Sequence, residues 1–471
     1  MKTEHMFAKR LAEVEKERDT EFVPESERNQ NPSSLFFIWF GSNLTIGDFA
    51  LGMLAAWYGM PLGWTFASVI LGTLAGGILL AIMSVMGPKA GYPQMIIGKT
   101  PFGKVGGSIM SFLQWMNTTG WLVFNAIIAA AALALLTSTG GFITLGGISM
   151  GLYLIPILVV SVLVFLLALF GHGMVHRFEK AMSVIIGLLF LYITAVSFQK
   201  VSVMISYSPA TLSATDLAFY FAGVFALSFS YIMSWGPYAS DYSRYVKTST
   251  SSTSVFGMTL AGSVLSTLWA EFAGIAIYVL VLPPDFANPA VPLQSFLGNF
   301  WYLGMITLLL GGLSANALNL YSNSLSFKGI GIKAKRHWIL ILTSTIAVLF
   351  AYFGYLKFAE SYEFFLYLLD YWITPWLGIM IADFFIVNRG KFRESSERYN
   401  WKGIASYLVA VIVSIPFMNQ SFNTILEFEG PVSTYLGGAD ISYFVSFFIA
   451  IILYTMVSRR FRAKELIGQA A

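Results

Sequence analysis

The 471-residue chain contains no cysteine and few charged residues. The absence of cysteine excludes disulfides, thiolate metal sites and cysteine nucleophiles. Charged residues make up 11% of the chain, against about 25% in a typical soluble domain. Hydrophobic residues make up 56%, so most of the chain must face something other than water. A soluble globular protein is therefore excluded.

Three further absences restrict the class of protein. No G-x-x-x-x-G-K-[ST] motif occurs, which argues against ATP as an energy source. The first 33 residues have no apolar core of a signal peptide, so the first membrane helix must direct insertion. The net charge of +4 is spread over short loops and does not indicate nucleic-acid binding. No obligate protein partner and no organic cofactor is indicated, and no soluble catalytic domain is present, so an enzyme is not expected.

Long apolar runs make up most of the chain. A helix needs about 20 apolar residues to cross a bilayer. Twelve such spans are predicted, with boundaries uncertain by about two to four residues. They cover 34–58, 63–87, 104–137, 152–170, 180–199, 216–240, 257–283, 297–325, 336–355, 361–388, 402–418 and 440–458.

The distribution of basic residues supports this count. If the N-terminus is cytoplasmic, 26 of the 28 Lys and Arg fall in cytoplasmic segments, and only Lys200 and Lys357 fall outside. An extra or missing helix would destroy this positive-inside pattern. We therefore predict a multi-pass protein of the inner or plasma membrane with cytoplasmic tails at 1–33 and 459–471 and a transporter domain at 34–458.

Two spans carry residues that interrupt helices. The first reads Gly41-Ser-Asn-Leu-Thr-Ile-Gly-Asp48, and the sixth contains Gly236-Pro237. Non-helical backbone at membrane depth marks binding sites in secondary transporters. Because the two spans are five apart, we predict inverted repeats at about 34–199 and 216–388, with two added helices at 402–458. The alternative is that these Gly and Pro residues only allow close helix packing.

Polar residues within the spans form the candidate sites. Asp48 is either a cation- or proton-coupling carboxylate or a cap of the broken helix. Trp121 and Asn125 share one face of span 3, which also carries Asn117, and Asn316 and Asn319 share one face of span 8. Amides beside an indole suit a flat heterocycle, although Asn residues also join helices to each other.

The chain offers few ligands for a metal ion, because it has four histidines and no cysteine. His172 and His176 have i, i+4 spacing beside Arg177 at a predicted loop. We expect a solvated turn there and no metal site.

At these residues the chain resembles the nucleobase:cation symporter-1 family, in its purine–cytosine permease branch. The resemblance runs from about Pro32 to Phe461 and is most specific at the end of span 6. The segments that carry it are Trp39-Phe-Gly-Ser-Asn43, Gly87-Pro-Lys-Ala-Gly-Tyr-Pro93, Pro101-Phe-Gly103, Gly120-Trp121, Pro237-Tyr-Ala-Ser-Asp-Tyr-Ser-Arg-Tyr245, Asn316-Ala-Leu-Asn319, Pro375 and Ala382-Asp-Phe384.

The resemblance implies a twelve-helix, all-α, 5+5 inverted-repeat symporter fold and a substrate site. Its members take up nucleobases or related heterocycles with a proton or sodium ion. It implies that Trp121 stacks on the substrate. A second aromatic from span 6 is either Tyr231 or Trp235. The other substrate contacts that it implies are Asn125, Asn316 and Asn319. Asn43 and Asn117 are candidates from their positions in the broken first span and in span 3.

The resemblance also implies a coupling-ion site between spans 1 and 8. Sodium-coupled members use span 1 carbonyls, here at Gly41 and Ser42, and two adjacent span 8 hydroxyls. This chain has Ser314 followed by Ala315, so one hydroxyl is absent. With Asp48 nearby, proton coupling is favoured over sodium coupling.

The sequence thus predicts a secondary active importer of cytosine, a purine or a related heterocycle. The alternatives within transport are allantoin, hydantoin, a thiamine precursor, an amino acid or another small solute. Alternatives of another class are a membrane sensor that binds without transport, and a channel.

Overall fold

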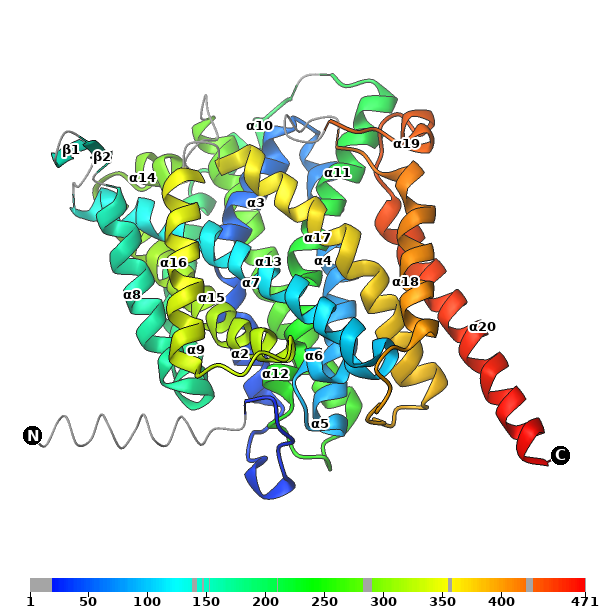
Figure 1. Cartoon of the computed structure of the whole chain (residues 1–471). Coiled ribbons are helices and arrows are strands. Elements are labelled where there is room, and N and C mark those ends of the chain that lie inside the picture. Colours follow the sequence, from blue (N-terminus) through cyan, green and yellow to red (C-terminus); the bar gives the residue numbers. More distant parts are fainter. Residues whose placement is uncertain are drawn as a thin grey trace, which may run out of the picture.

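The computed structural model is almost entirely helical. It describes residues 19–137, 142–145, 148–151, 153–209, 211–282, 290–354, 358–420 and 427–470. Both ends of the described chain lie at one end of the helical bundle (Figure 1), which we call the tail end. Helix α10 (Val201–Ser206) and helix α19 (Pro431–Tyr435) lie at the opposite end. The predicted N-terminal tail is described only from Asp19 onward.

The first half of the chain contains the first broken helix. The helices of this half are α2 (Ser33–Asn43), α3 (Ile46–Trp57), α4 (Leu62–Ser84), α5 (Met86–Ala90), α6 (Gln94–Ile97), α7 (Lys99–Thr137), α8 (Leu154–Leu169) and α9 (Gly171–Phe198). Strands β1 (Phe142–Leu145) and β2 (Ile148–Gly151) form an antiparallel hairpin between α7 and α8, with Phe142 opposite Gly151.

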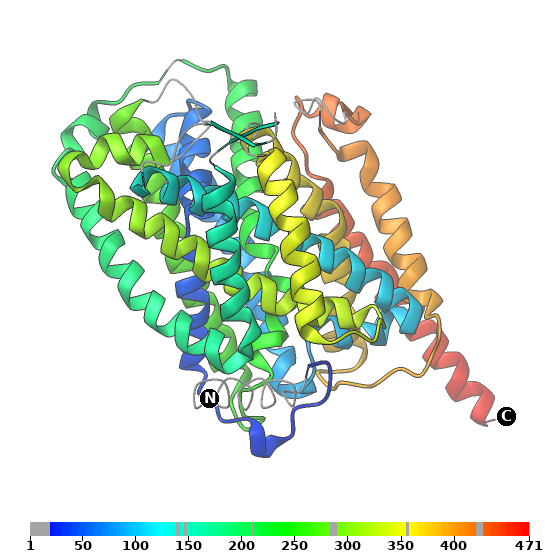
Figure 2. The same ribbon diagram turned by 60° about the vertical axis from the view of Figure 1, so that its left-hand side comes forward.

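The second half of the chain also consists mainly of long helices. They are α11 (Ala214–Met233), α12 (Ala239–Ser243), α13 (Ser252–Val281), α14 (Ala290–Leu297), α15 (Trp301–Gly329), α16 (Arg336–Gly354), α17 (Phe358–Ile381), α18 (Trp401–Ser414) and α20 (Ser442–Ala470). Figure 2 shows α18 and α20 along one side of the bundle, apart from α8, α9 and α16.

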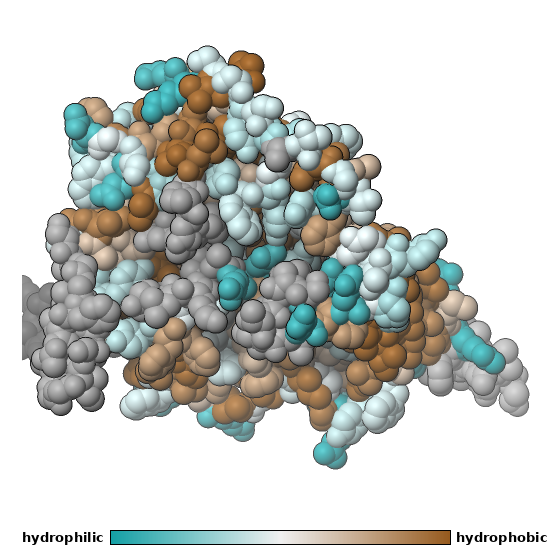
Figure 3. Space-filling view, turned by 90° about the horizontal axis from the view of Figure 1, so that it is seen from above, coloured by the Kyte–Doolittle hydropathy of each residue, from teal (hydrophilic) through white to brown (hydrophobic). Residues whose placement is uncertain are grey.

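Most of the long helices can cross a membrane. Among the described residues, nine helices are long and apolar enough, and the bent pair α2–α3 would make a tenth. Two further apolar helices, Leu154–Leu169 and Trp401–Phe417, are shorter. The outer faces of these long and short apolar helices expose large hydrophobic side chains such as Leu188, Phe350 and Ile412. The end opposite the tails instead mixes hydrophilic and hydrophobic side chains (Figure 3). The chain is a multi-pass membrane protein.

Both predicted helix interruptions are confirmed. Helix α2 ends at Asn43 and α3 begins at Ile46, with a bend of 56° between them. Helix α11 ends at Met233, and a 3-10 turn over Gly236–Tyr238 leads into α12. Pro237 lies in that turn, where its missing N–H costs no helical hydrogen bond.

Two glycines let α3 and α13 cross in direct backbone contact. A Cβ atom added at Gly52 would lie 1.9 Å from the carbonyl oxygen of Glu271. A Cβ atom added at Gly274 would lie 2.0 Å from the carbonyl oxygen of Phe49. Small residues permit such close crossings, which gain van der Waals contact along the whole interface. This crossing holds the second half of the broken first span in place.

Residues 19–31 form a strap across the tail end. The backbone N–H of Val23 donates to Gly91 at 2.9 Å, and that of Gln30 donates to Tyr245 at 3.1 Å. The buried Arg28 donates to the carbonyl of Pro88 at 2.6 Å. The strap thereby joins the segments that follow α4 and α12.

Candidate substrate and ion site

One face of α7 presents a row of buried polar side chains. Gln114, Asn117, Trp121 and Asn125 follow one another at intervals of three or four residues, so they share a helical face. All four are at most 3% exposed. Three were predicted site residues, and Gln114 was missed although the same spacing points to it.

Each of these side chains keeps one polar atom without a hydrogen-bond partner among the described residues. The four atoms are Gln114 Nε2, Asn117 Oδ1, Trp121 Nε1 and Asn125 Oδ1. Buried polar atoms are nearly always hydrogen-bonded, and each orphan costs about 1–3 kcal/mol. A row that mixes unpaired donors and acceptors is therefore suited to a ligand that carries both.

Three aromatic rings lie close to the indole of Trp121. Its ring centroid lies 5.1 Å from Tyr231, 5.2 Å from Phe365 and 6.2 Å from Tyr362, all in edge-to-face geometry. Tyr362 and Phe365 belong to α17 and were not predicted, because their approach depends on how α17 packs against α7. None of these three rings is stacked parallel on the indole.

The structure separates the two aromatic candidates of the sixth span. Tyr231 contacts Trp121, and its hydroxyl lies 2.9 Å from the Thr45 hydroxyl in the break of the first span. Trp235 packs instead against Trp39 at 5.4 Å and Tyr238 at 5.0 Å. Tyr231 is therefore the sixth-span aromatic that lies beside the α7 row.

A chain of amides joins α7 to α15. Asn125 Nδ2 donates to Asn316 Oδ1 at 3.2 Å, and Asn319 Nδ2 donates to the same oxygen at 3.4 Å. Tyr238 donates its hydroxyl to Asn319 Oδ1 at 2.9 Å. The predicted residues on spans 3 and 8 thus contact each other. Their amides join the two helices, and they also lie beside the Asn125 oxygen that has no partner among the described residues.

The predicted residues of the first span fall into two environments. Asn43 donates to the carbonyl of Trp39 at 2.8 Å and leaves Oδ1 unpaired among the described residues. The Ser42 hydroxyl donates a hydrogen bond to the same carbonyl oxygen at 3.3 Å. Asp48 lies in the first turn of α3 and accepts a hydrogen bond at 3.0 Å from the side-chain hydroxyl of Thr45, the N-cap residue of that helix. Asp48 is buried, so its coupling role stays a prediction beside its capping role.

The predicted ion site contains a carboxylate that sequence reasoning missed. Ser314 donates to Glu179 Oε2 at 2.5 Å, and its hydroxyl lies 3.3 Å from the carbonyl oxygen of Gly41. Glu179 is fully buried, and its Oε1 has no partner among the described residues. Gly41 permits this approach, since a Cβ there would lie 3.0 Å from Glu179 Oε2.

The expectation of a loop before span 5 is wrong. Because Glu179 precedes the predicted span, it is not among the predicted site residues. We placed the span at 180–199, but α9 begins at Gly171, directly after α8. Glu179 is therefore eight residues inside the helix, about 12 Å from its start. Arg177 and Lys180 flank it in sequence but point to other faces of the helix.

The expected solvated turn at His172 is also wrong. His172 is 5% exposed, lies 2.6 Å from the amide nitrogen of Gln30, and stacks on Tyr245 at 4.0 Å. It packs the strap against α9. Within the described residues, no group of three or more His, Asp and Glu could hold a metal ion.

These features define a class of protein. A bundle of apolar helices with two broken spans, a buried polar row beside the breaks and a buried carboxylate near one of them is the arrangement of a secondary transporter.

The comparisons identify the family. The chain belongs to the nucleobase:cation symporter-1 family, because the family profile described as "Permease for cytosine/purines, uracil, thiamine, allantoin" matches residues 22–446. The family consists of transporters, so this chain is a transporter and not an enzyme.

Similar proteins cover nearly the whole chain. The Bacillus subtilis (strain 168) protein named "Putative purine-cytosine permease YxlA" is 28% identical over 94% of this chain and 95% of its own. The purine-cytosine permease FCY21 of Saccharomyces cerevisiae is 21% identical over 91% of this chain and 82% of its own. The solved structure of Mhp1, closed with bromovinylhydantoin bound, aligns with a TM-score of 0.74 at 19% identity and covers 96% of both chains.

Proposed function

We propose that this transporter imports cytosine, a purine or a related flat heterocycle by proton symport. The observation that carries the proposal is the α7 row. A nucleobase edge offers N–H donors and carbonyl or ring-nitrogen acceptors, which complement the orphan atoms of Gln114, Asn117 and Asn125. Its ring would stack on the indole of Trp121. The names of the similar permeases support the same substrate class.

We further propose that all twelve apolar segments span the inner or plasma membrane, with both tails cytoplasmic. The two shorter helices, α8 and α18, would then cross as spans 4 and 11. The distribution of Lys and Arg supports this orientation. Spans 1–5 and 6–10 would form inverted repeats, and transport would proceed by rocking one bundle of helices against the other.

A thermal-shift panel on the purified protein tests the substrate class. We expect cytosine, adenine or hypoxanthine to raise the apparent melting temperature, because a ligand that binds only the folded state stabilises it. Allantoin, hydantoin, a thiamine precursor and an amino acid form the comparison set. If a member of that set stabilises the protein and no nucleobase does, the proposed substrate is wrong.

Counterflow in proteoliposomes separates transport from the alternatives. A transporter exchanges labelled base for unlabelled base with saturation. A sensor that binds the base without flux would show no exchange, and a channel would show neither saturation nor coupling. Either result would contradict the proposal.

For the coupling ion, we propose that Glu179 carries the proton. A buried carboxylate with no cationic partner among the described residues is unfavourable when charged, so it must be neutralised by a proton or a bound cation. Only one span 8 hydroxyl, that of Ser314, faces the Gly41 carbonyl. That is a sparse set of ligands for sodium, whereas one carboxyl group is enough for a proton.

The variant Glu179→Gln tests this assignment. The amide keeps the shape of a protonated carboxyl group but cannot release a proton. We expect uptake driven by a pH gradient to fall to the level without a gradient, while counterflow of labelled base continues. The matched variant Asp48→Asn should retain coupling if Asp48 only caps α3.

Two results would contradict the Glu179 assignment. One is loss of coupling in Asp48→Asn but not in Glu179→Gln, which would return the role to Asp48. The other is uptake by the unmodified protein that responds to a sodium gradient alone, which would exclude proton symport.

A further inference from the structure

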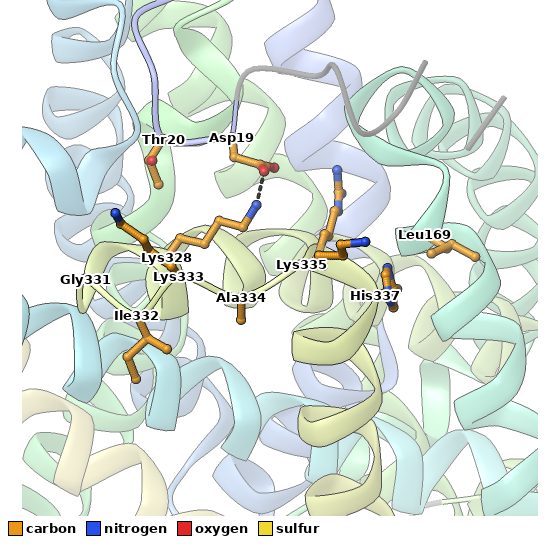
Figure 4. Close-up of a pocket in the computed structure, with 11 residues that line it drawn as sticks. Asp19, Thr20, Leu169, Lys328, Gly331, Ile332, Lys333, Ala334, Lys335 and His337 are labelled. Atoms are coloured by element: carbon orange, nitrogen blue, oxygen red, sulfur yellow. Dashed lines mark hydrogen bonds and ion pairs between the residues drawn. The ribbon is translucent and has the colours of Figure 1, made fainter. Parts of the chain in front are cut away.

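A basic cavity lies at the tail end between α15 and α16. Its volume is 610 Å³, and it is lined by Lys328, Lys333, Lys335, His337 and Leu169, among others. Figure 4 shows these side chains around the cavity, with Lys328 joined to the carboxylate of Asp19. The cavity therefore concentrates positive charge at the end of two helices.

Two of the lysines are free to bind an anion. The side chains of Lys333 and Lys335 are exposed and make no hydrogen bond or ion pair within the part of the chain that the structure describes. Arg336, which lies between Lys335 and His337, also lines the cavity, but its side chain has partners of its own. It donates to the carbonyl of Ala168 at 3.0 Å and lies over the ring of Tyr321 at 4.9 Å, which fixes the start of α16 against the end of α8.

A second cavity is an apolar groove of 310 Å³ on the outer surface between α8 and α16. On α8 its lining includes Leu158, Val162 and Phe165, and on α16 it includes Ile341 and Val348. Several of these side chains are large, hydrophobic and more than 40% exposed, as lipid-facing residues are. A groove between such helices can hold a hydrocarbon chain.

The two cavities lie along the same pair of helix faces. Leu169 of the basic cavity follows Phe165 of the groove by four residues on α8. His337 of the basic cavity precedes Ile341 of the groove by four residues on α16. Residues four apart are stacked on one face of a helix. The groove and the basic cavity are therefore neighbours, about one turn apart along these two helices.

The length of this path matches one leaflet of a membrane. From His337 to Val348 the helix rises about 16 Å, and half of a bilayer core is about 15 Å. Trp338, next to His337, is 63% exposed at the start of α16, where interfacial tryptophans are common. The basic cavity thus lies at headgroup depth and the groove at acyl-chain depth.

We propose that this site binds an anionic glycerophospholipid. Its phosphate would lie between Lys333, Lys335 and His337, and one acyl chain would occupy the groove between α8 and α16. Basic pockets at helix ends bind acidic lipid headgroups in other membrane proteins. A soluble anion would use the cavity but leave the neighbouring apolar groove unused, so the lipid fits both features.

The test is a lipid titration of the full-length protein purified in detergent. We expect phosphatidylglycerol to raise the apparent melting temperature more than phosphatidylcholine with the same acyl chains. The double variant Lys333→Gln/Lys335→Gln should weaken the phosphatidylglycerol effect by about tenfold or more in apparent affinity, since each basic residue near an acidic lipid contributes about 1 kcal/mol. The control Lys391→Gln/Arg393→Gln removes two exposed charges elsewhere at the tail end and should leave the effect unchanged.

A second pair of variants tests the groove. Thr345 lines it, so Thr345→Phe should fill it and remove the preference for phosphatidylglycerol. Leu342→Phe alters a lipid-exposed position of α16 outside the lining and should have no such effect. Each variant is first compared with the unmodified protein in phosphatidylcholine, so that a folding defect is recognised.

Three results would overturn the proposal. Equal stabilisation by the two lipids would mean ordinary solvation by lipid. Equal stabilisation by glycerol 3-phosphate would mean a soluble-anion site. Equal losses in the Lys333→Gln/Lys335→Gln variant and its control would mean that only net charge matters.

Discussion

The variant Trp121→Ala is expected to reduce uptake at low substrate concentration to near background. The change removes the ring on which the heterocycle stacks and the unpaired Nε1 donor beside it. Stacking of a base on an aromatic side chain contributes about 1–3 kcal/mol, which corresponds to roughly five- to 150-fold in affinity. Transport of labelled base by proteoliposomes measures the effect, and size-exclusion chromatography checks that the protein is folded.

Conservative variants make the prediction specific to this ring. Trp121→Phe keeps an aromatic face but loses the N–H, so its affinity should fall between those of Trp121→Ala and the unmodified protein. Trp235→Phe is the matched control, because Trp235 packs against Trp39 and Tyr238 instead of the α7 row. If Trp235→Phe weakened binding more than Trp121→Phe, the site would lie elsewhere.

The second large effect is expected at the crossing of α3 and α13. Replacing a helical glycine by alanine usually stabilises a helix by about 1 kcal/mol. At Gly52 the sign should reverse, because the added Cβ would lie 1.9 Å from the carbonyl oxygen of Glu271. Neither atom belongs to a flexible side chain, so the helices must separate. Destabilisation well beyond 1 kcal/mol follows, as in other overpacked sites.

The comparison with Gly257→Ala isolates this effect. Gly257 lies on α13 itself, and a Cβ there would have no neighbour within 4 Å. We expect Gly257→Ala to leave the apparent melting temperature in detergent unchanged or higher, and Gly52→Ala to lower it sharply with loss of monodisperse protein. Equal behaviour of the two variants would contradict the close crossing.

The local signals in the sequence located the breaks and most of the polar row. Gly and Pro act on their own backbone, so the interruptions near Asn43 and at Pro237 could be predicted without knowing their neighbours. The spacing of Trp121 and Asn125 fixed a shared helical face for the same reason. Their partners on α15 followed from equivalent spacing at Asn316 and Asn319.

Contacts set by tertiary packing could not be predicted in this way. Glu179 lies just outside the predicted span 180–199, because charged residues such as Arg177 and Lys180 are typical of the end of a span, although helix α9 continues through it. Tyr362 and Phe365 approach Trp121 only because α17 packs across α7. Choosing Tyr231 over Trp235 likewise required the geometry of the turn that follows α11.

The strap at the tail end has a consequence for the kinetics of the transport cycle. Its bonds to Gly91 and Tyr245 must be exchanged for water before the segments beneath it separate. In the rocking cycle proposed above, these bonds would therefore add to the activation barrier for opening at that end, without contributing contacts to the substrate. The backbone amides of Val23 and Gln30 donate those bonds, so their hydrogen-exchange rates would report how often this end opens.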